Sequence, residues 1–355
     1  MNAIWILLIA GLLVLAQMLV FKRAGLTGVS VARRFTKKRL FAGESLEMVE
    51  TIENRRLLPV PWLKVETRMP ESFLFGRQEN LEIGGQRYHS SVFFLGPWRR
   101  VRRTHSVRAA RRGYFAFSTV TLTVGDLFGL TNASRVQPLQ ESVTVYPQLL
   151  PRSQVPLPAS RWQGERTVRR FIQPDPFLYN GIRDYRPGDS VRDVHWRAYA
   201  RTGQLKIKQH DYTAASKLLV LLNIAPEERL WGQIGLEHHE RLERAISLAV
   251  SLCCYALEDG LDVGLGCNAD LSQFEGQTLF IAPASGPQQR ERILEAAARL
   301  RIQRVLNFHN YLESMPLPSD TDILLLSAYD SPLIQAQAQR LRSFGNTVSR
   351  CPFPS

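Results

Sequence analysis

Cysteine is scarce in this chain, and its few cysteines follow no metal-binding or disulfide pattern. The 355 residues include four, Cys253, Cys254, Cys267 and Cys351, with no Cys-x-x-Cys pair and no His/Cys cluster. This spacing excludes the usual zinc sites and a disulfide framework. We therefore expect free thiols in a reducing compartment, with Cys253 and Cys254 as small core residues of an apolar helix.

The short motifs of the commonest enzyme chemistries are also missing. The chain has no Ser nucleophile elbow, no P-loop and no Gly-x-Gly-x-x-Gly dinucleotide loop. The residues His238, His239 and Glu240 do not have the His-Glu-x-x-His spacing, and we interpret them as the polar start of a helix. No catalytic residue, no cofactor and no resident metal is predicted.

One long apolar run stands at the N-terminus. Residues Ile4 to Phe21 are apolar apart from Gln17 and small residues. As a helix they would span about 27 Å, close to the roughly 30 Å hydrocarbon core of a membrane. No Lys or Arg precedes the run and no small-residue cleavage site follows it, which disfavours a secretory signal. Residues 1–23 are therefore predicted to be an anchor.

Basic residues follow this anchor and set its predicted orientation. They are Lys22, Arg23, Arg33, Arg34, Lys37, Lys38 and Arg39. The positive-inside rule places this side in the cytoplasm, so we expect a single-pass protein of the inner (cytoplasmic) membrane with a cytoplasmic body. Residues 22–170 hold 26 Lys or Arg and 11 Asp or Glu, whereas residues 171–355 hold 19 and 21. The basic half lies next to the anchor, where it would meet anionic lipid; nucleic acid is a less favoured partner.

Residues 24–148 are predicted to form a β domain. Short runs of strand-forming residues are separated by turns that contain Gly, Pro or Asn, at Ser45–Ile52, Trp62–Thr67, Tyr88–Phe94, Thr104–Ala109 and Thr119–Thr123. Several short strands in this length indicate an immunoglobulin-like sandwich. A basic cluster of Arg99, Arg100, Arg102 and Arg103 beside Trp98 is interpreted as a solvated or lipid-facing loop.

A dense, charged stretch connects two halves of different composition. Residues 149–174 are rich in Pro, Ser and Arg and are predicted to be an extended basic linker. Within the following segment, 175–215, Arg186-Pro187-Gly188-Asp189 has the type II turn pattern. Ser190 would then cap a helix from about Val191 to Thr202, with Asp193 and Arg197 paired and Gly203 ending it. A strand follows from Leu205.

Residues 216–355 alternate between strand and helix patterns, which favours a mainly parallel sheet with helices on both faces. Leu218–Ile224 is a continuous apolar run, typical of a strand buried on both faces. The other predicted strands are Leu261–Gly266, Thr278–Ala282 and Asp322–Ser327, and the predicted helices are His238–Glu258, Gln288–Leu300 and Ser331–Ser343.

The stretch Tyr179–Asp211 resembles the signature of the bacterial family catalogued as domain of unknown function family 58. The matching residues are Gly181, Arg183, Asp184, Tyr185, Arg186, Pro187, Gly188, Asp189, Trp196, Ala200, Arg201, Thr202, Gly203 and Leu205. Further matches are Arg111-Arg112-Gly113-Tyr114, Gly125-Asp126-Leu127-Phe128-Gly129-Leu130 and Val145-Tyr146-Pro147. The resemblance implies an immunoglobulin-like domain, a von Willebrand factor A-like α/β domain and a MoxR-type AAA+ ATPase as partner.

In a von Willebrand factor A-like domain, a divalent cation is held after the first strand by an Asp-x-Ser-x-Ser motif. The matching positions here are Asn223, Ala225 and Glu227, so the Asp and both Ser ligands are missing. Ala has no side-chain oxygen, and Asn offers only a neutral one. The sequence therefore predicts a degenerate site that holds no metal.

The signature residues are predicted to act in structure and docking rather than in catalysis. They are Arg183, Asp184, Tyr185, Arg186, Pro187, Gly188, Asp189, Asp193, Trp196, Arg201, Thr202 and Gly203. Asp193 and His195 are two positions apart and would diverge on a helix. We expect a membrane-anchored, non-enzymatic scaffold or adaptor that docks the ATPase in a chaperone-like or envelope-related process. The alternatives are an anionic-lipid or nucleic-acid binder through the basic half, and a hydrolase that uses the signature carboxylates.

Overall fold

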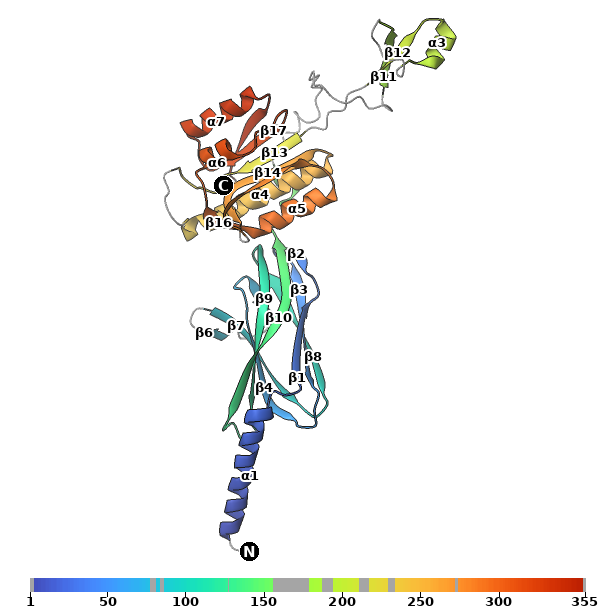
Figure 1. The fold of residues 1–355 in the computed structure, drawn as a ribbon. Helices are drawn as coiled ribbons and strands as arrows, with labels where there is room; N and C mark the ends of the chain where they lie inside the picture. Colours follow the sequence, from blue (N-terminus) through green and yellow to red (C-terminus); the bar gives the residue numbers. More distant parts are fainter. Residues whose placement is uncertain are drawn as a thin grey trace.

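The structure is a computed structural model, and it describes residues 3–76, 81–83, 86–126, 128–155, 179–186, 194–210, 217–228, 234–271 and 274–353. Along the chain these residues form an N-terminal helix, a β-sandwich, a small strand–helix–strand module and a C-terminal α/β domain (Figure 1). The predicted turn at Arg186–Asp189 and the residues Ser190 and Asp193 lie wholly or partly outside the described residues.

The N-terminal helix α1 spans Ala3–Ala24 and is long and apolar enough to cross a membrane. Most of its side chains are exposed, but Phe21 near its end is only 5% exposed and belongs to the core of the β-sandwich. The guanidinium of Arg56, from the sandwich, donates to the carbonyls of Ala24 and Gly25. Since the last carbonyls of a helix lack partners within it, Arg56 caps α1. The helix is thus joined firmly to the domain that follows.

Two sheets pack face to face to make the sandwich. The first has the order β1-β3-β8-β5 and the second β2-β10-β9-β4-β7-β6. Their strands are β1 Val29–Phe35, β2 Arg39–Phe41, β3 Ser45–Asn54, β4 Val60–Arg68, β5 Phe73–Phe75, β6 Leu81–Ile83, β7 Gln86–Leu95, β8 Arg100–Ala109, β9 Gly113–Gly125 and β10 Asn132–Tyr146. Alternate residues of β3 and β8 point inward, as the period of two in their sequences requires. All five predicted strands fall on observed ones.

The basic cluster at residues 99–103 is not the loop that its charge suggested. Arg100, Arg102 and Arg103 lie in strand β8. Arg100 pairs with Glu53 at 2.9 Å, and the Arg103 guanidinium lies 4.4 Å from the centre of the Phe93 ring. Arg100 and Arg102 point to the outer face of the sheet, whereas Arg103 has the parity of the buried His105 and lies over Phe93 of the other sheet. Long Arg side chains can do this because their stems are apolar and only their tips need water.

The small module consists of β11 Tyr179–Asp184, α3 Trp196–Thr202 and β12 Lys206–His210, with β11 and β12 antiparallel. The C-terminal domain has a six-stranded sheet in the order β15-β14-β13-β17-β18, with β16 also paired to β14. Its elements are β13 Lys217–Leu222, α4 His239–Glu258, β14 Asp262–Leu271, β15 Phe274–Ala284, α5 Pro287–Arg299, β16 Leu300–Arg304, α6 Phe308–Ser314, β17 Asp322–Ser327, α7 Pro332–Ser343 and β18 Thr347–Pro352.

Strands β14, β13, β17 and β18 pair in parallel, whereas β15 and β16 are antiparallel to β14. Leu218, Val220 and Leu222 of β13 face a core that includes α4 and α5. Leu219 and Leu221 face the opposite core, with α6 and α7. This two-sided burial accounts for the unbroken apolar run at the start of the domain.

The sandwich and the α/β domain are joined by buried polar contacts. Arg112, whose side chain is 4% exposed, donates to the carboxylate of Glu243 at 2.7 Å and to the carbonyls of Ala297 and Leu300 at 2.7 and 2.8 Å. The two carbonyls end helix α5, so Arg112 caps that helix from the other domain. The Arg299 guanidinium lies 4.0 Å from the centre of the Tyr114 ring, on the same side of the joint.

Residues 149–155 of the predicted linker lie on α4. Leu150 accepts a hydrogen bond from the Tyr255 hydroxyl at 2.7 Å, and its N–H donates to Ser251 Oγ at 2.8 Å. Arg152 pairs with Asp259 at 2.6 Å. Residues 156–174 lie outside the described residues. All four cysteines are free, and three of them are buried in the α/β domain.

Candidate functional sites

The first candidate is the small module, which holds the signature residues. Asp184 and Lys206 are paired across β11 and β12 and form an ion pair. The Lys206 ammonium lowers the pKa of the Asp184 carboxyl, first through its hydrogen bond and then through its charge. Val194 forms a bridge to Ile207, and both side chains are 4% exposed. Asp184 thus has a structural partner within the module.

The helix of this module is shorter than predicted. It begins at Trp196, and His195 caps it because its Nδ1 accepts from the backbone N–H of Ala198 at 3.0 Å. The sequence pattern placed its start near Val191, with Ser190 as the cap. Val194 is instead extended, because it pairs with Ile207, so the helix starts after it. At the other end Gly203 has φ 68° and donates to the Tyr199 carbonyl at 2.8 Å, as a helix-ending glycine does.

Aromatic side chains of the module remain exposed. Trp196 is 60% exposed, Tyr199 41% and Tyr185 39%, and the rings of Trp196 and Tyr199 meet edge to face with centres 6.2 Å apart. Arg201 lies on the same short helix. The Thr202 hydroxyl bonds back to the Ala198 carbonyl at 2.9 Å. Tyr185 donates its backbone N–H to the Leu205 carbonyl at 3.0 Å. This arrangement presents a surface and offers no paired acid and base among the described residues.

The second candidate is the carboxyl edge of the parallel strands, where α/β proteins usually bind ligands. Asn223 is fully buried there, and its Oδ1 accepts from the N–H of Ala225 and from Nδ2 of Asn268, each at 3.0 Å. Its Nδ2 donates to Ser327 Oγ at 3.0 Å. The one Asn223 oxygen that could bind a metal therefore already accepts two hydrogen bonds, and the side-chain amide as a whole links β13, β14 and β17. Glu227 is exposed.

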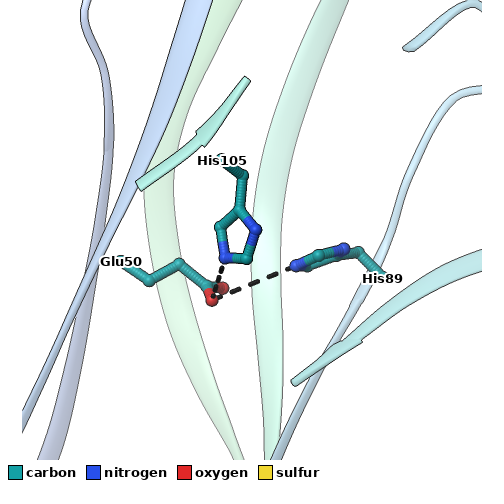
Figure 2. Close-up of side chains that lie close together, drawn as sticks. All are labelled: Glu50, His89 and His105. Atoms are coloured by element: carbon teal, nitrogen blue, oxygen red, sulfur yellow. Dashed lines mark hydrogen bonds and ion pairs between the residues drawn. The ribbon is translucent and has the colours of Figure 1, made fainter. Parts of the chain in front are cut away.

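The third candidate is a polar cluster inside the sandwich that the sequence reasoning missed (Figure 2). Glu50 Oε2 lies 3.2 Å from His105 Nε2 and 4.0 Å from His89 Nε2. Glu50 and His105 come from one sheet and His89 from the other. The other Glu50 oxygen accepts from the guanidinium of Arg33, which is buried directly opposite on β1. The Phe75 ring stacks on His89 with centres 4.6 Å apart.

Burial and neighbouring charge shift the pKa values of this polar cluster. Burial alone would raise the pKa of Glu50, but the hydrogen bond with His105 and the charge of Arg33 outweigh it and bring the pKa to about 2. Burial lowers the pKa of His89 to about 4, against a smaller opposing effect of Glu50. The cluster therefore contains a charged Glu50–Arg33 pair and a neutral His89 near pH 7.

A carboxylate and two imidazoles form a donor set that can bind a divalent cation. Here, however, Arg33 already neutralises the carboxylate. Adding a dication would place its charge beside a fixed guanidinium in a buried site, which is costly. The described geometry fits a charge network that ties the two sheets together better than it fits a metal centre.

The model of the family described as "Protein of unknown function DUF58" matches residues 181–324, from β11 into β17. The resemblance to this family is thus confirmed over residues 181–324. The uncharacterized protein YeaD of Bacillus subtilis (strain 168) is 24% identical over 242 residues, which are 68% of this chain and 56% of YeaD. The chain thus spans little more than half the length of this relative.

Two solved structures are similar to a third of the chain. One is the CARDB domain of the PF1109 protein from Pyrococcus furiosus, in complex with di-metal ions, with 17% identity and a TM-score of 0.22 over 33% of this chain and 91% of that one. The other is a non-cellulosomal cohesin from the archaeon Archaeoglobus fulgidus, with 12% identity and a TM-score of 0.23 over 33% and 91%.

The DUF58 segment contains the first two candidate sites, and the polar cluster lies outside it. A signal for that cluster was present in the sequence. Glu50 stands in register with Met48 and Ile52 on an alternating strand, so it falls on the buried face. A charged residue at an inward position needs a partner, and Arg33 and His105, on the strands either side of β3, supply it.

Proposed function

We propose that this DUF58 chain is a membrane-anchored, non-enzymatic scaffold that docks a MoxR-type AAA+ ATPase on the cytoplasmic side. The observation that carries the anchor is the joint between α1 and the sandwich. A signal peptide is removed from the mature protein, but Phe21 is part of the sandwich core and Arg56 caps the helix. Cleavage after α1 would leave a hole where Phe21 packs and would remove the Ala24 carbonyl that accepts from Arg56.

The rigid course of the chain supports a scaffold. α1 is capped by the sandwich, and the sandwich is joined to the α/β domain through Arg112. Such a chain holds its C-terminal domain at a fixed distance from the membrane. At each candidate site the described polar groups, buried or exposed, make structural contacts, which favours a binding role over chemistry.

The module supports the docking role. Its exposed Trp196 and Tyr199, with Arg201 on the same helix, belong to the residue types that carry most binding energy at protein interfaces. The basic side chains of the module, such as Arg201, favour an acidic partner surface. The α/β domain, which we propose to be von Willebrand factor A-like, would complete the docking surface.

The anchor is tested on the full chain in its own membranes. We expect it to resist alkaline carbonate extraction and to keep an intact N-terminal peptide by mass spectrometry. A mature chain that begins after residue 24, or one that alkaline carbonate releases from the membrane, would refute the proposed anchor.

Docking is tested with the purified ATPase and the full chain in detergent. Trp196→Ala and Arg186→Ala should each weaken binding about tenfold or more, the effect of losing an interface hot spot. Trp98→Ala removes a comparably exposed indole, 69% against 60%, from the sandwich and serves as the control. Absence of binding by the wild-type chain, or equal loss in all three variants, would refute the docking role.

A further inference from the structure

The end of the sandwich that receives α1 is built from three loops, which we call the base loops: 55–59, 96–99 and 128–131. The backbone N–H of Trp98 donates to the Arg56 carbonyl at 3.1 Å, and the Asn54 side chain donates to the Leu58 and Gly96 carbonyls, each at 3.0 Å. Trp62, near the start of β4, pairs with Gly125 at the end of β9, so the β9–β10 hairpin turns at this same end. Figure 1 shows α1 leaving the sandwich beside that hairpin.

Large apolar side chains of the base loops are exposed. Leu57 is 76% exposed, Trp98 69%, Phe128 63% and Leu130 58%. Gathered at one end of a domain, such side chains mark a surface that contacts something apolar. They belong to short loops, and none of them fills a core.

The loops are shaped so that these side chains point outward. The buried Asp126 accepts the Leu130 N–H at 2.7 Å and holds the hairpin turn, in which Gly129 has φ 70°. This explains the Gly-Asp-Leu-Phe-Gly-Leu motif, which no other site uses. Trp98 itself has φ 52°, an uncommon backbone conformation for a bulky residue. A strained, exposed indole points to a function at that position.

Basic side chains surround the apolar ones. Lys22 and Arg23 end α1, and Arg55, Arg99 and Arg100 lie on or beside the base loops; all are exposed. Glu53 pairs with Arg55 at 2.7 Å and with Arg100 at 2.9 Å, so one acidic residue offsets part of this charge. The balance at this end is positive.

We propose that the base loops sit in the headgroup layer of the bilayer that holds α1, and that they bind anionic phospholipid. The proposal rests on the proposed membrane anchor. A membrane that takes up α1 necessarily brings this end of the sandwich to its surface. Trp and basic residues are the side chains that prefer this interface, and anionic headgroups attract the arginines. The α/β domain is thereby held upright on the membrane as well as tethered to it.

The test places an environment-sensitive fluorophore on the base loops of the full chain. Cys351→Ser removes the one half-exposed thiol, and Phe128→Cys then carries the label. Val136→Cys is the control, because Val136 is 62% exposed on β10 and lies about 13 Å along the strand from Asn132, where the hairpin turn ends, at about 3.3 Å per residue. The labelled chains are reconstituted in vesicles of phosphatidylcholine with phosphatidylglycerol, or of phosphatidylcholine alone.

We expect the label at 128 to be protected severalfold from aqueous iodide relative to the label at 136, and more strongly with phosphatidylglycerol present. If the chain floats with the vesicles but the two labels are quenched equally, this proposal is wrong and the anchor stands. Equal protection in both lipids refutes the anionic-headgroup part. If the chain does not float with the vesicles, both the proposed anchor and this proposal are refuted.

Discussion

Glu50 and His89 make the sandwich sensitive to acid, because the folded pKa of each is below its ordinary value. Below pH 6.5 His89 is protonated in the unfolded chain, whereas in the folded chain it stays neutral until about pH 4. Below 4.5 the same holds for Glu50 until about pH 2. Stability is thus full above pH 6.5 and is lost as the pH falls. His89 alone should cost on the order of 3 kcal/mol between pH 7 and 4.

This loss can be followed by urea unfolding at several pH values, with hydrogen exchange of β3 peptides reporting on the sandwich. His89→Gln should flatten the profile between pH 6.5 and 4. Identical profiles for the variant and the wild type would show that His89 does not control this range.

The buried Arg33–Glu50 ion pair should also affect the stability of the sandwich. Glu50→Gln leaves a buried guanidinium without its counter-charge, which should destabilise the sandwich by about 3–5 kcal/mol. Glu47→Gln, on the exposed face of the same strand, should change the urea midpoint little. If both variants unfold alike, the buried pair does not contribute as the geometry indicates.

Asn223 is the residue at which a metal site and a structural network compete. Asn223→Asp restores the carboxylate of a metal-binding motif, but it removes the donor to Ser327 and buries a charge. We expect a lower unfolding temperature and no stoichiometric heat on Mg²⁺ titration, for both wild type and variant. Tight Mg²⁺ binding by the wild type that Asn223→Ala abolishes would restore the metal site.

Among the elements, helix α3 depends on its C-terminal glycine. Gly203→Ala places a side chain at φ 68°, which should cost about 1–2 kcal/mol and fray the last turn. Hydrogen exchange of the residue 203 amide, which bonds to Tyr199, measures this directly. The neighbouring Gln204→Ala keeps the backbone conformation and should leave the exchange rate unchanged; a similar rise in both variants would contradict the role of the glycine.

The elements also show how far the sequence could predict the fold. Strands with clear alternation, such as β3, and the doubly buried β13 were predicted near their true bounds. β10, with fifteen residues the longest of the described strands, was missed because Pro138 and its polar neighbours weaken the pattern, and a register shift follows Pro138. Its pairing with β9 holds it, and a partner strand is invisible to local periodicity. α3 was misplaced for the same reason, since the Val194–Ile207 bridge is a contact between distant residues.

For the whole molecule, the sequence predicted an apolar N-terminal helix and a strand-rich domain after it, but it could not predict how the parts are joined. The motif Arg111–Tyr114 was found only as a resemblance. In the fold, Arg112 and Tyr114 of this motif both contact the α/β domain, more than a hundred residues away. Likewise, the polar cluster could be recognised only once four strands from two sheets were brought together.

Arg112 is the point at which the coupling between the two domains can be tested. Arg112→Met keeps an apolar stem but removes the bonds to Glu243, Ala297 and Leu300, at a cost of about 2–4 kcal/mol to the joint. Arg112→Lys keeps the charge but lacks the fork that reaches several acceptors at once, so it should lie between. Calorimetry should show the transitions of the sandwich and the α/β domain moving apart in that order.

The exposed neighbour provides the control, because Arg111→Met removes a positive charge at the same turn and leaves the bonds of Arg112 to Glu243, Ala297 and Leu300 in place. Its calorimetric profile should match that of the wild type. Separation of the transitions in Arg111→Met as well would assign the effect to net charge. No separation in Arg112→Met would mean that other contacts hold the two domains together, such as the ion pairs of Arg39 with Glu291 and Glu295. The outcome bears directly on the proposed scaffold, because only a rigid joint would let an anchor at α1 fix the position of the proposed docking surface.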